Sequence, residues 1–334
     1  MPIRKASKIL VTGGAGYVGS RLVPKLLSAG YEVVVFDLYL YGERALAQAR
    51  GDQRLHEVKG DLRDRAGVDR AMRGVDTVIH LACISNDPSF ELNPELGKSI
   101  NYDCFAPLVA SAKDAGVSRF VYASSSSVYG VKEEERVTEE LPLEPLTDYS
   151  KFKAMCEEVL MAQREPGFET VILRPATVCG YAPRLRLDLS VNILTNHAVN
   201  NRVIRVFGGS QVRPNIHIED MTDLYVQTVS LPRELVDGKI YNAGYYNQTM
   251  NEIAQAVRGV VGEDVAIRVE PTDDLRSYRI DSSLIQRELG FTPMRSVSDA
   301  VRDLCDAFGR GWIPDSMTDP RYFNIKTMQL AGLQ

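Results

Sequence analysis

The sequence is poor in the residues that build metal sites and disulfide frameworks. Its 334 residues include five cysteines and four histidines. The cysteines (Cys83, Cys104, Cys156, Cys179 and Cys305) form no Cys-x-x-Cys pair, and no histidine stands at ligand spacing from them. We therefore expect no metal site and no disulfide framework. An odd number of thiols without such pairing is typical of a protein from the reducing cytoplasm.

Long apolar runs and an excess of basic charge are also missing. No segment approaches the ~20 apolar residues that a membrane helix needs, and the apolar run after the basic start MPIRKASK is too short for a signal peptide. The chain has 39 Lys and Arg against 44 Asp and Glu, a formal net charge of −5. It therefore carries no basic footprint for nucleic acid. We expect a soluble, cytoplasmic protein with neither a nucleic-acid nor a membrane partner.

What the first half of the chain does have is a regular alternation of short apolar runs and amphipathic stretches. We expect strands at 8–12, 32–36, 77–82, 119–125 and 170–175, and helices at 17–29, 65–73, 94–115 and 149–163. Near-continuous apolar strands separated by helices indicate a parallel sheet that is covered on both faces. The predicted fold class is α/β, with a doubly wound parallel sheet of the Rossmann type.

The pattern changes after Gly180. A loop rich in Pro and Arg is followed by an expected helix at 189–200, and then by short strands and helices in mixed order. We expect a smaller, mixed α/β C-terminal domain that binds the substrate. The predicted division gives 1–178, with a return segment at about 215–245, to the sheet domain, and 179–214 with 246–334 to the second domain.

A glycine-rich turn follows the first expected strand. KILVTGGAGYVGS places Gly13, Gly14, Gly16 and Gly19 between that strand and a helix. Such glycines let a diphosphate approach bare backbone N–H groups at a helix N-terminus. Asp37 ends the second strand about 20 residues later, where a carboxylate binds the adenosine ribose hydroxyls and repels a 2′-phosphate. The sequence therefore predicts a dinucleotide site that prefers NAD to NADP.

A tyrosine and a lysine stand four residues apart at the start of the helix expected at 149–163. Tyr-x-x-x-Lys is frequent by chance, and TDYSKFK also reads as an ordinary capped helix start. Upstream, the strand in VYASSSSVYG ends in four serines. The carboxyl ends of parallel strands face the crevice in which such sheets bind ligands. These serines and Tyr149 are therefore expected at one site.

Taken in order, these motifs resemble the extended short-chain dehydrogenase/reductase family, specifically its NAD-dependent nucleotide-sugar epimerases and dehydratases. The ordered set comprises TGGAGYVGS, Asp37, GDL, HLA, Asn101, SSSSVYG, YSKFK, LRPATVCG and RPNIHIEDM, and it spans nearly the whole chain. The resemblance implies that NAD contacts Gly13, Gly16, Tyr17, Val18, Gly19, Asp37, Leu38, Asp61, Leu62, Leu81, Ala82, Asn101, Tyr149, Lys153 and Pro175.

The resemblance also assigns the catalytic roles. Tyr149 is the acid/base, Lys153 is its partner, and Ser125 is the hydroxyl that shares the substrate's proton. Residues i and i+4 share a helix face, so the ammonium can approach the phenol. One cation at ~4 Å and an effective dielectric near 20 supplies roughly the 4 kcal/mol that would lower a phenol pKa from about 10 to near 7. We therefore expect Lys153 to lower the pKa of Tyr149.

The serine run bears on which reaction of the family is catalysed. Members first oxidise a sugar hydroxyl, usually at C4, and the dehydratases and decarboxylases carry an acid after the catalytic Ser or Thr. Ser126 and Ser127 occupy those positions here. Because they do not move protons at neutral pH, 4,6-dehydration is disfavoured. The stretch instead resembles the 4-epimerases of UDP-hexoses and UDP-hexuronic acids, which form a transient 4-keto sugar.

Two other activities are weighed against the epimerase. The alternative is an NAD-dependent nucleotide-sugar dehydrogenase or 4-keto-sugar reductase of the same family. A non-catalytic NAD sensor is less favoured, because the Tyr-x-x-x-Lys pair and its serine are both present. The sequence identifies neither the nucleotide nor the sugar.

The resemblance further places contacts to a nucleotide-diphosphate sugar. These fall on Ser126, Asn192, Arg213 and Arg276, and arginine suits diphosphate oxygens because its donors form a planar fork. PRLRLDLS adds Arg184 and Arg186, which either bind an extra anionic group or only flank the loop.

A homodimer is also implied, through the helices expected at 94–115 and 149–163. Phe105, Leu108, Val109, Phe152 and Met155 are the candidate seam residues, although some of them can instead face the sheet.

Overall fold

Seven parallel strands form the main sheet, in the order β10-β6-β5-β4-β1-β2-β3. The computed structural model describes residues 7–85, 87–272, 277 and 279–333. The strands are β1 (Lys8–Thr12), β2 (Glu32–Asp37), β3 (Leu55–Lys59), β4 (Thr77–His80), β5 (Arg119–Ala123), β6 (Glu169–Pro175) and β10 (Lys239–Ala243). The strand order reverses on either side of β1, which confirms the predicted doubly wound sheet and puts a ligand crevice beside β1 and β4.

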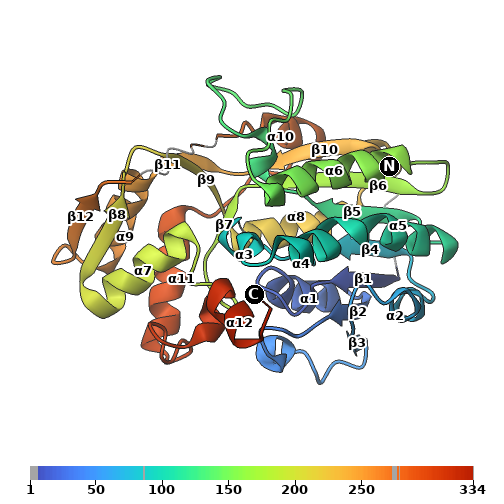
Figure 1. Ribbon diagram of the computed structural model, residues 1–334, viewed down its shortest axis with the longest axis horizontal. Coiled ribbons are helices and arrows are strands. Elements are labelled where there is room, and N and C mark those ends of the chain that lie inside the picture. Colours follow the sequence, from blue (N-terminus) through green and yellow to red (C-terminus); the bar gives the residue numbers. More distant parts are fainter. Residues whose placement is uncertain (1–6, 86, 273–276, 278, 334) are drawn as a thin grey trace.

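Helices cover both faces of this sheet, because successive strand residues point to opposite sides. Ile9 and Val11 of β1 pack on the face that carries α1 (Gly19–Ser28) and α8 (Ile218–Ser230). Leu10, between them, packs on the face that carries α2 (Arg65–Ala71), α5 (Phe105–Asp114) and α6 (Asp148–Ala162). Figure 1 shows α5 and α6 in front of the strands.

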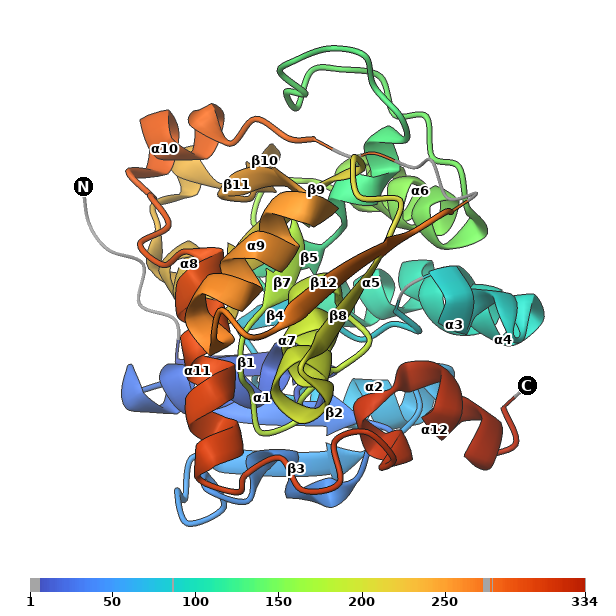
Figure 2. The same ribbon diagram turned by 90° about the vertical axis from the view of Figure 1, so that its left-hand side faces the viewer.

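A smaller lobe with its own apolar core lies beside the carboxyl edge of the sheet (Figures 1 and 2). It contains α7 (Ser190–Asn201), β8 (Val203–Phe207), α9 (Met250–Val261), β12 (Ala266–Glu270) and α11 (Val297–Gly309). A second small sheet, β11 (Tyr246–Thr249), β9 (Val212–His217) and β7 (Thr177–Cys179), lies between the lobe and the main sheet, and α10 (Ser283–Leu289) packs near β10. This mixed α/β lobe matches the predicted fold class, whereas the division of the chain into domains stays a proposal.

The structure differs from the expected elements in several places. The stretch 94–115 is broken into α4 (Pro94–Lys98), a π-helical turn (Ser99–Asp103) and α5. The edge strand β3 (Leu55–Lys59) was missed because LHEVK is at most half-buried and has no continuous apolar run. Two short helices, α3 (Asp87–Glu91) and α12 (Asn324–Leu330), were also missed, and they pack against each other beside the crevice.

Two further observations concern the chain as a whole. The five cysteines carry free thiols, as the sequence predicted. Within the described part of the chain, no helix combines the length and the apolar character that a membrane crossing requires.

Candidate active site

The carboxyl ends of the central strands open into a pocket of about 540 Å³. Most of the predicted site residues line it: Gly13, Gly16, Tyr17, Val18, Gly19, Asp37, Leu38, Asp61, Leu62, Leu81, Ala82, Ser125, Ser126, Tyr149, Lys153, Pro175 and Arg213. Asn101 and Asn192 lie behind its wall, and Arg276 lies outside the described residues. The pocket thus brings together residues that are more than a hundred positions apart in the sequence.

The glycine loop leaves space that a side chain would fill. Gly13 has φ +73°, and a Cβ there would stand 2.7 Å from the Cα of Ala82. A Cβ at Gly16 would meet only the Gly13 carbonyl oxygen, at 3.0 Å, and would otherwise project into open space. Gly19, the first residue of α1, follows directly and lines the pocket. This cradle fits the diphosphate of a dinucleotide.

Asp37 is held at the end of β2 by backbone N–H groups on both sides. Its carboxylate accepts hydrogen bonds from the backbone N of Ala15, at 2.9 Å, and of Tyr39, at 2.7 Å. Burial raises the pKa of Asp37, although these two donors and the Arg184 guanidinium act in the opposite direction. The carboxylate therefore stands beside the glycine loop, in the place predicted for ribose recognition.

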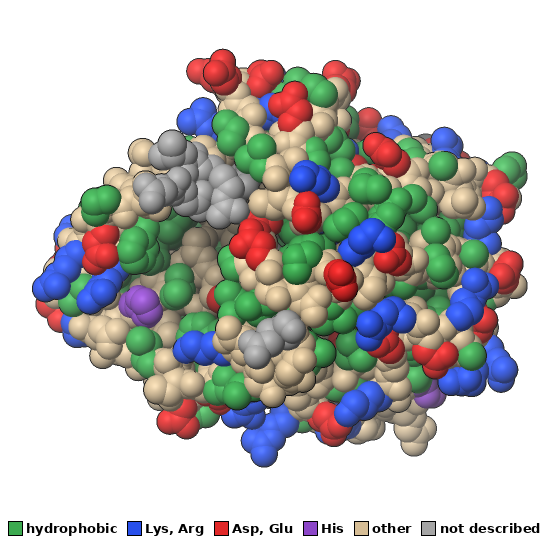
Figure 3. All heavy atoms as spheres, viewed as in Figure 1, with side chains coloured by type: hydrophobic (Ala, Val, Ile, Leu, Met, Phe, Trp, Pro, Cys, Tyr) green, Lys and Arg blue, Asp and Glu red, His purple; other side chains and the backbone are tan. Residues whose placement is uncertain are grey.

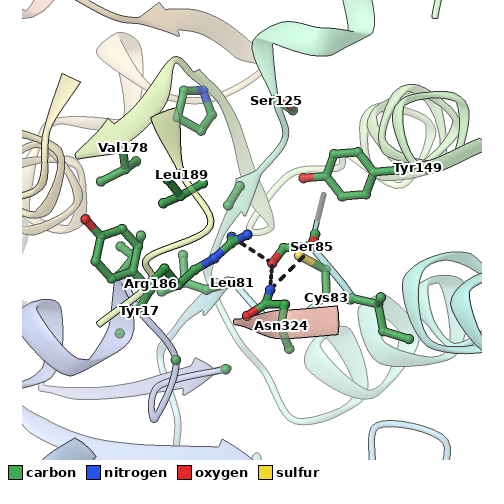
Figure 4. A pocket seen from close by; sticks show the side chains of 18 of the residues that line it. Tyr17, Leu81, Cys83, Ser85, Ser125, Tyr149, Val178, Arg186, Leu189 and Asn324 are labelled. Carbon is green, nitrogen blue, oxygen red and sulfur yellow. Dashed lines mark hydrogen bonds between the residues drawn. The ribbon is translucent and has the colours of Figure 1, made fainter. Parts of the chain in front are cut away.

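The Tyr149 phenol points into the pocket from the first turn of α6 (Figure 4). Thr147 caps this helix through a capping box with Ser150, which fixes where the helix begins. One turn later, Lys153 is buried. Its Nζ donates to the carbonyl oxygen of Ala123 at 2.7 Å and lies 6.0 Å from the centroid of the Tyr149 ring.

The pKa of Tyr149 is raised by its surroundings in the protein, and not lowered as the sequence predicted. Burial raises the pKa of the phenol well above its ordinary value, and electrostatic interactions with Cys83 and Asp87 raise it further. The charge of Arg186 and a hydrogen bond from Ser125 lower the pKa of Tyr149, but by less than burial raises it. The physical reason is that the interior disfavours a phenolate, while the ammonium is directed at a backbone carbonyl.

The serines after β5 have different partners. Ser125 caps the short 3₁₀ helix at Ser126–Tyr129, and its Oγ lies 2.8 Å from the Oγ of Ser127. Ser124 points away and donates to the buried carboxylate of Glu157, which forms an ion pair with Arg174 at 2.6 Å. The hydrogen bond between Ser124 and Glu157 fixes the end of β5, next to which Ser125 lies close to Tyr149.

Two residues that were predicted to contact a ligand form part of the support behind the pocket wall. Asn192 is fully buried, and its amide is bonded to the backbone N of Gly180, at 3.0 Å, and to the carbonyl of Arg186, at 2.8 Å. Asn101, in the π-helical turn, bonds both the backbone N and the carbonyl oxygen of Ile84. Neither amide reaches the pocket, so both position loops instead of touching a ligand directly.

Sequence reasoning missed an acid beside the candidate base. Asp87, the first residue of α3, lines the pocket and accepts a hydrogen bond from the Thr147 hydroxyl at 2.6 Å. The negative charge of Asp87 raises the pKa of the Tyr149 phenol, and Cys83 acts in the same direction. Both residues lie in ACISNDPSFELNP, after β4, so an acid in a loop that follows a central strand was the available signal.

Arginines from the loop before α7 enter the same pocket. Arg186 donates to Asp188 at 2.9 Å and to the Ser85 hydroxyl at 3.0 Å, and Figure 4 shows it crossing the pocket toward Ser85. Asn324 of α12 reaches the same hydroxyl from the other side. The C-terminal helix was not expected at the site.

A family model described as the NAD dependent epimerase/dehydratase family matches residues 9–244. The UDP-glucose 4-epimerase of Lactobacillus helveticus is 28% identical over 317 residues, which cover 88% of this chain and 94% of that protein. The dTDP-glucose 4,6-dehydratase of Streptomyces griseus is 31% identical over 307 residues, which cover 88% of this chain and 91% of that protein.

The fold is likewise similar to a solved structure with bound NAD. The crystal structure of DesIV, a dTDP-glucose 4,6-dehydratase from Streptomyces venezuelae, gives a TM-score of 0.82 at 30% identity, over 91% of this chain and 98% of that one. Epimerases and dehydratases thus resemble this chain about equally, so overall similarity does not decide the reaction.

Proposed function

The chain belongs to the NAD dependent epimerase/dehydratase family, and within that family we propose that it is a nucleotide-sugar 4-epimerase. The observation that carries this proposal is the row of hydroxyls at the end of β5. Ser125, Ser126 and Ser127 line the pocket where the dehydratases of this family place an acid after the catalytic hydroxyl. A site with hydroxyls there holds the 4-keto sugar without promoting elimination.

We propose that NAD lies along the carboxyl edge of the sheet. Gly13, Gly16 and Gly19 hold its diphosphate, Asp37 its adenosine ribose, and Lys153 its nicotinamide ribose. The remaining predicted contacts that line the pocket flank this path. When bound, NAD supplies the reversible oxidation and reduction of the sugar at C4. The Ala123 carbonyl holds the Lys153 ammonium at the end of β5, in reach of that ribose.

Tyr149 and Ser125 move the proton of the C4 hydroxyl. Tyr149 accepts this proton, with Ser125 as the hydroxyl that shares it, and returns it when the sugar is reduced again. Burial raises the pKa of the phenol. The protonated phenol, which returns the proton to the sugar, is therefore the stable form of Tyr149. The proton-accepting form is the phenolate, which nearby positive charge stabilises. The Arg186 guanidinium supplies such a charge and lowers the pKa of Tyr149.

The sugar nucleotide then occupies the side of the pocket that faces the small lobe. Arg213 of β9 is the candidate diphosphate contact and Ser126 the candidate sugar contact, since both line the pocket. The proposed domain division follows: 1–178 with about 215–245 binds NAD, and 179–214 with 246–334 binds the sugar nucleotide. Arg276 keeps its proposed role but lies outside the described residues.

We propose a homodimer through the outer surface of α5 and α6. Figure 3 shows hydrophobic side chains gathered over these helices among charged ones. Met155 is 37% exposed, and Phe152 is half-buried and stacked on Tyr102. The other seam candidates, Phe105, Leu108 and Val109, are buried against the sheet and do not reach the surface. Light scattering at micromolar concentration tests this: a monomer would exclude it.

Asp87 favours a second candidate function, 4,6-dehydration. It places a carboxyl group in the pocket beside Tyr149, although on α3 and not after the catalytic serine. Elimination requires such a group to move protons between C5 and C6 of the sugar. The second candidate therefore predicts that Asp87→Asn abolishes product formation, whereas the epimerase retains C4 inversion in that variant.

Incubation with a panel of UDP-, GDP-, dTDP- and CDP-sugars tests the proposal. We expect a C4-inverted sugar nucleotide to accumulate without net change in nicotinamide absorbance. Stoichiometric consumption of cofactor without inversion would identify the dehydrogenase or reductase, and a 4-keto-6-deoxy product the dehydratase.

A further inference from the structure

Arg184 comes from the loop before α7 but contacts the dinucleotide end of the pocket. Its backbone N donates to the Oγ of Ser20, on the first turn of α1, at 3.3 Å. Its guanidinium carbon lies 3.7 Å from the centroid of the Tyr41 ring, which follows β2. The charge of Arg184 also acts on Asp37 at the end of β2. The backbone of Arg184 thus lies against the start of α1, and its guanidinium lies against the segment that follows β2.

The Arg184 guanidinium is buried, and one of its N–H donors has no hydrogen-bond acceptor among the described residues. Arg184 is 6% exposed and lines the pocket. Among the residues that the structure describes, no group accepts a hydrogen bond from its Nε. Burial lowers the pKa of Arg184 to about 10. A buried, incompletely satisfied cation is costly unless an anion pairs with it.

The C-terminal helix fixes the orientation of this side chain. Asn324, at 1% exposure, accepts from the Arg184 guanidinium through Oδ1 and donates to the Ser85 hydroxyl at 2.9 Å. Its backbone N donates to Asp188 at 3.0 Å. Asn324 therefore ties the arginine loop to the loop after β4, and it fixes the Arg184 side chain in the wall of the pocket.

We propose that Arg184 is a cofactor-binding residue: its guanidinium contacts the dinucleotide diphosphate, and Asn324 positions it. The bound diphosphate is then held between the N–H groups at the start of α1 and the arginine fork from the opposite wall. The C-terminal helix thereby contributes to retention of NAD. This inference rests on the NAD dependence of the family and on the cradle geometry, and it is independent of the proposed epimerase reaction.

A second diphosphate with the same chemistry, that of the sugar nucleotide, is the alternative ligand for Arg184. Three observations favour the cofactor: the contact with Ser20 of α1, the stacking on Tyr41, and the proximity to Asp37. Tyr41 and Asp37 line the pocket close to β2, and Ser20 lies on α1 directly after the glycine loop. Arg213, by contrast, enters from β9 on the side of the small lobe.

The experiment is calorimetric titration of the full-length protein, freed of copurified nucleotide, with adenosine, AMP, ADP, NAD and UDP in separate runs. In Arg184→Gln we expect the Kd values for ADP and NAD to rise about 10- to 100-fold, the scale of a lost hydrogen bond to a charged group. The Kd for adenosine should change by less than about twofold, since adenosine carries no phosphate.

Three companion variants keep the result interpretable. Arg184→Lys retains the charge without the Nε–H and should lose less affinity for ADP than Arg184→Gln. Asn324→Ala should weaken ADP and NAD in the same direction but by a smaller factor. Arg205→Gln, an exposed site in β8, should leave every Kd unchanged. If Arg184→Gln does not fold, the Lys and Asn324 variants carry the test.

Two results would overturn the assignment. An equal loss for adenosine and ADP would mean that Arg184 only supports the shape of the pocket. A loss confined to UDP would assign the arginine to the sugar nucleotide. Because every titration omits the sugar and the reaction, the outcome is separate from that of the proposed function.

Discussion

Lys153 directs its ammonium at the carbonyl oxygen of Ala123, 2.7 Å away, while the Tyr149 ring centroid lies 6.0 Å from the same nitrogen. The lysine is therefore tied to the end of β5, the strand that also carries Ser125. A helix and a strand end are thus joined at the proposed place of proton transfer. This contact gives Lys153 a role in holding the site together, beside its proposed role in binding the cofactor.

Lys153→Met should lower both turnover and NAD affinity. Turnover should fall by about 10²-fold or more, the scale of acid–base assistance, and NAD should bind more weakly because the ribose loses its donor. Steady-state kinetics and titration with NAD measure the two effects. If NAD affinity is unchanged, the proposed ribose contact is wrong.

Arg186→Gln should shift the pH–rate profile to higher pH. Burial raises the pKa of Tyr149, and the positive charge of Arg186 lowers it. Removing that charge disfavours the phenolate, so the limb on which activity rises as Tyr149 loses its proton must move upward. Arg186→Lys keeps the charge and should move the limb less. An unmoved limb in Arg186→Gln would mean that another group titrates there.

Asp37→Asn should reduce the preference for NAD over NADP. The carboxylate repels the 2′-phosphate, and two unit charges about 4 Å apart interact by about 4 kcal/mol at an effective dielectric of 20. The ratio of the two Kd values should therefore change by at least about tenfold. Asparagine can still accept the hydrogen bond from Ala15. An unchanged ratio would place the ribose elsewhere.

Arg174→Leu should destabilise the protein strongly, because it leaves the Glu157 carboxylate buried without its cation. The side chains of both residues are 4% exposed. Losing one partner of a buried pair costs about 3–5 kcal/mol of unfolding free energy. The double variant with Glu157→Leu should be less destabilised than the sum of the single changes. Urea unfolding of all four proteins measures this, and strict additivity would show that the pair is not coupled.

The main sheet was predictable because its central strands are short, buried and almost entirely apolar. Tyr149, Lys153 and Asp37 were identifiable because local spacing places them at strand or helix ends. By contrast, β3 is a half-buried edge strand without such a run. The break in 94–115 arises from a π-helical turn whose Asn101 bonds the neighbouring loop, and periodicity does not reveal it.

The rest of the site depends on contacts between distant parts of the chain. Asn324 bonds Arg184 although the two residues are 140 positions apart in the sequence. Neither the presence of the C-terminal helix at the site nor the orientation of the Arg184 side chain could therefore be predicted from the sequence. The Tyr149 pKa was misjudged for a similar reason. The i,i+4 spacing shows that two residues share a helix face, but not that the ammonium is bonded to Ala123.

The most direct test of the proposed 4-epimerase uses a nucleotide sugar that the enzyme turns over, carrying deuterium at C4. The products are followed by NMR together with nicotinamide absorbance, and Tyr149→Phe serves as the control that should lose turnover by orders of magnitude while still binding NAD. The account predicts a sugar inverted at C4 that keeps its deuterium at C4, with no net change in absorbance. Deuterium at C6 of a 4-keto-6-deoxy sugar, or deuterium accumulating in reduced cofactor, would contradict it.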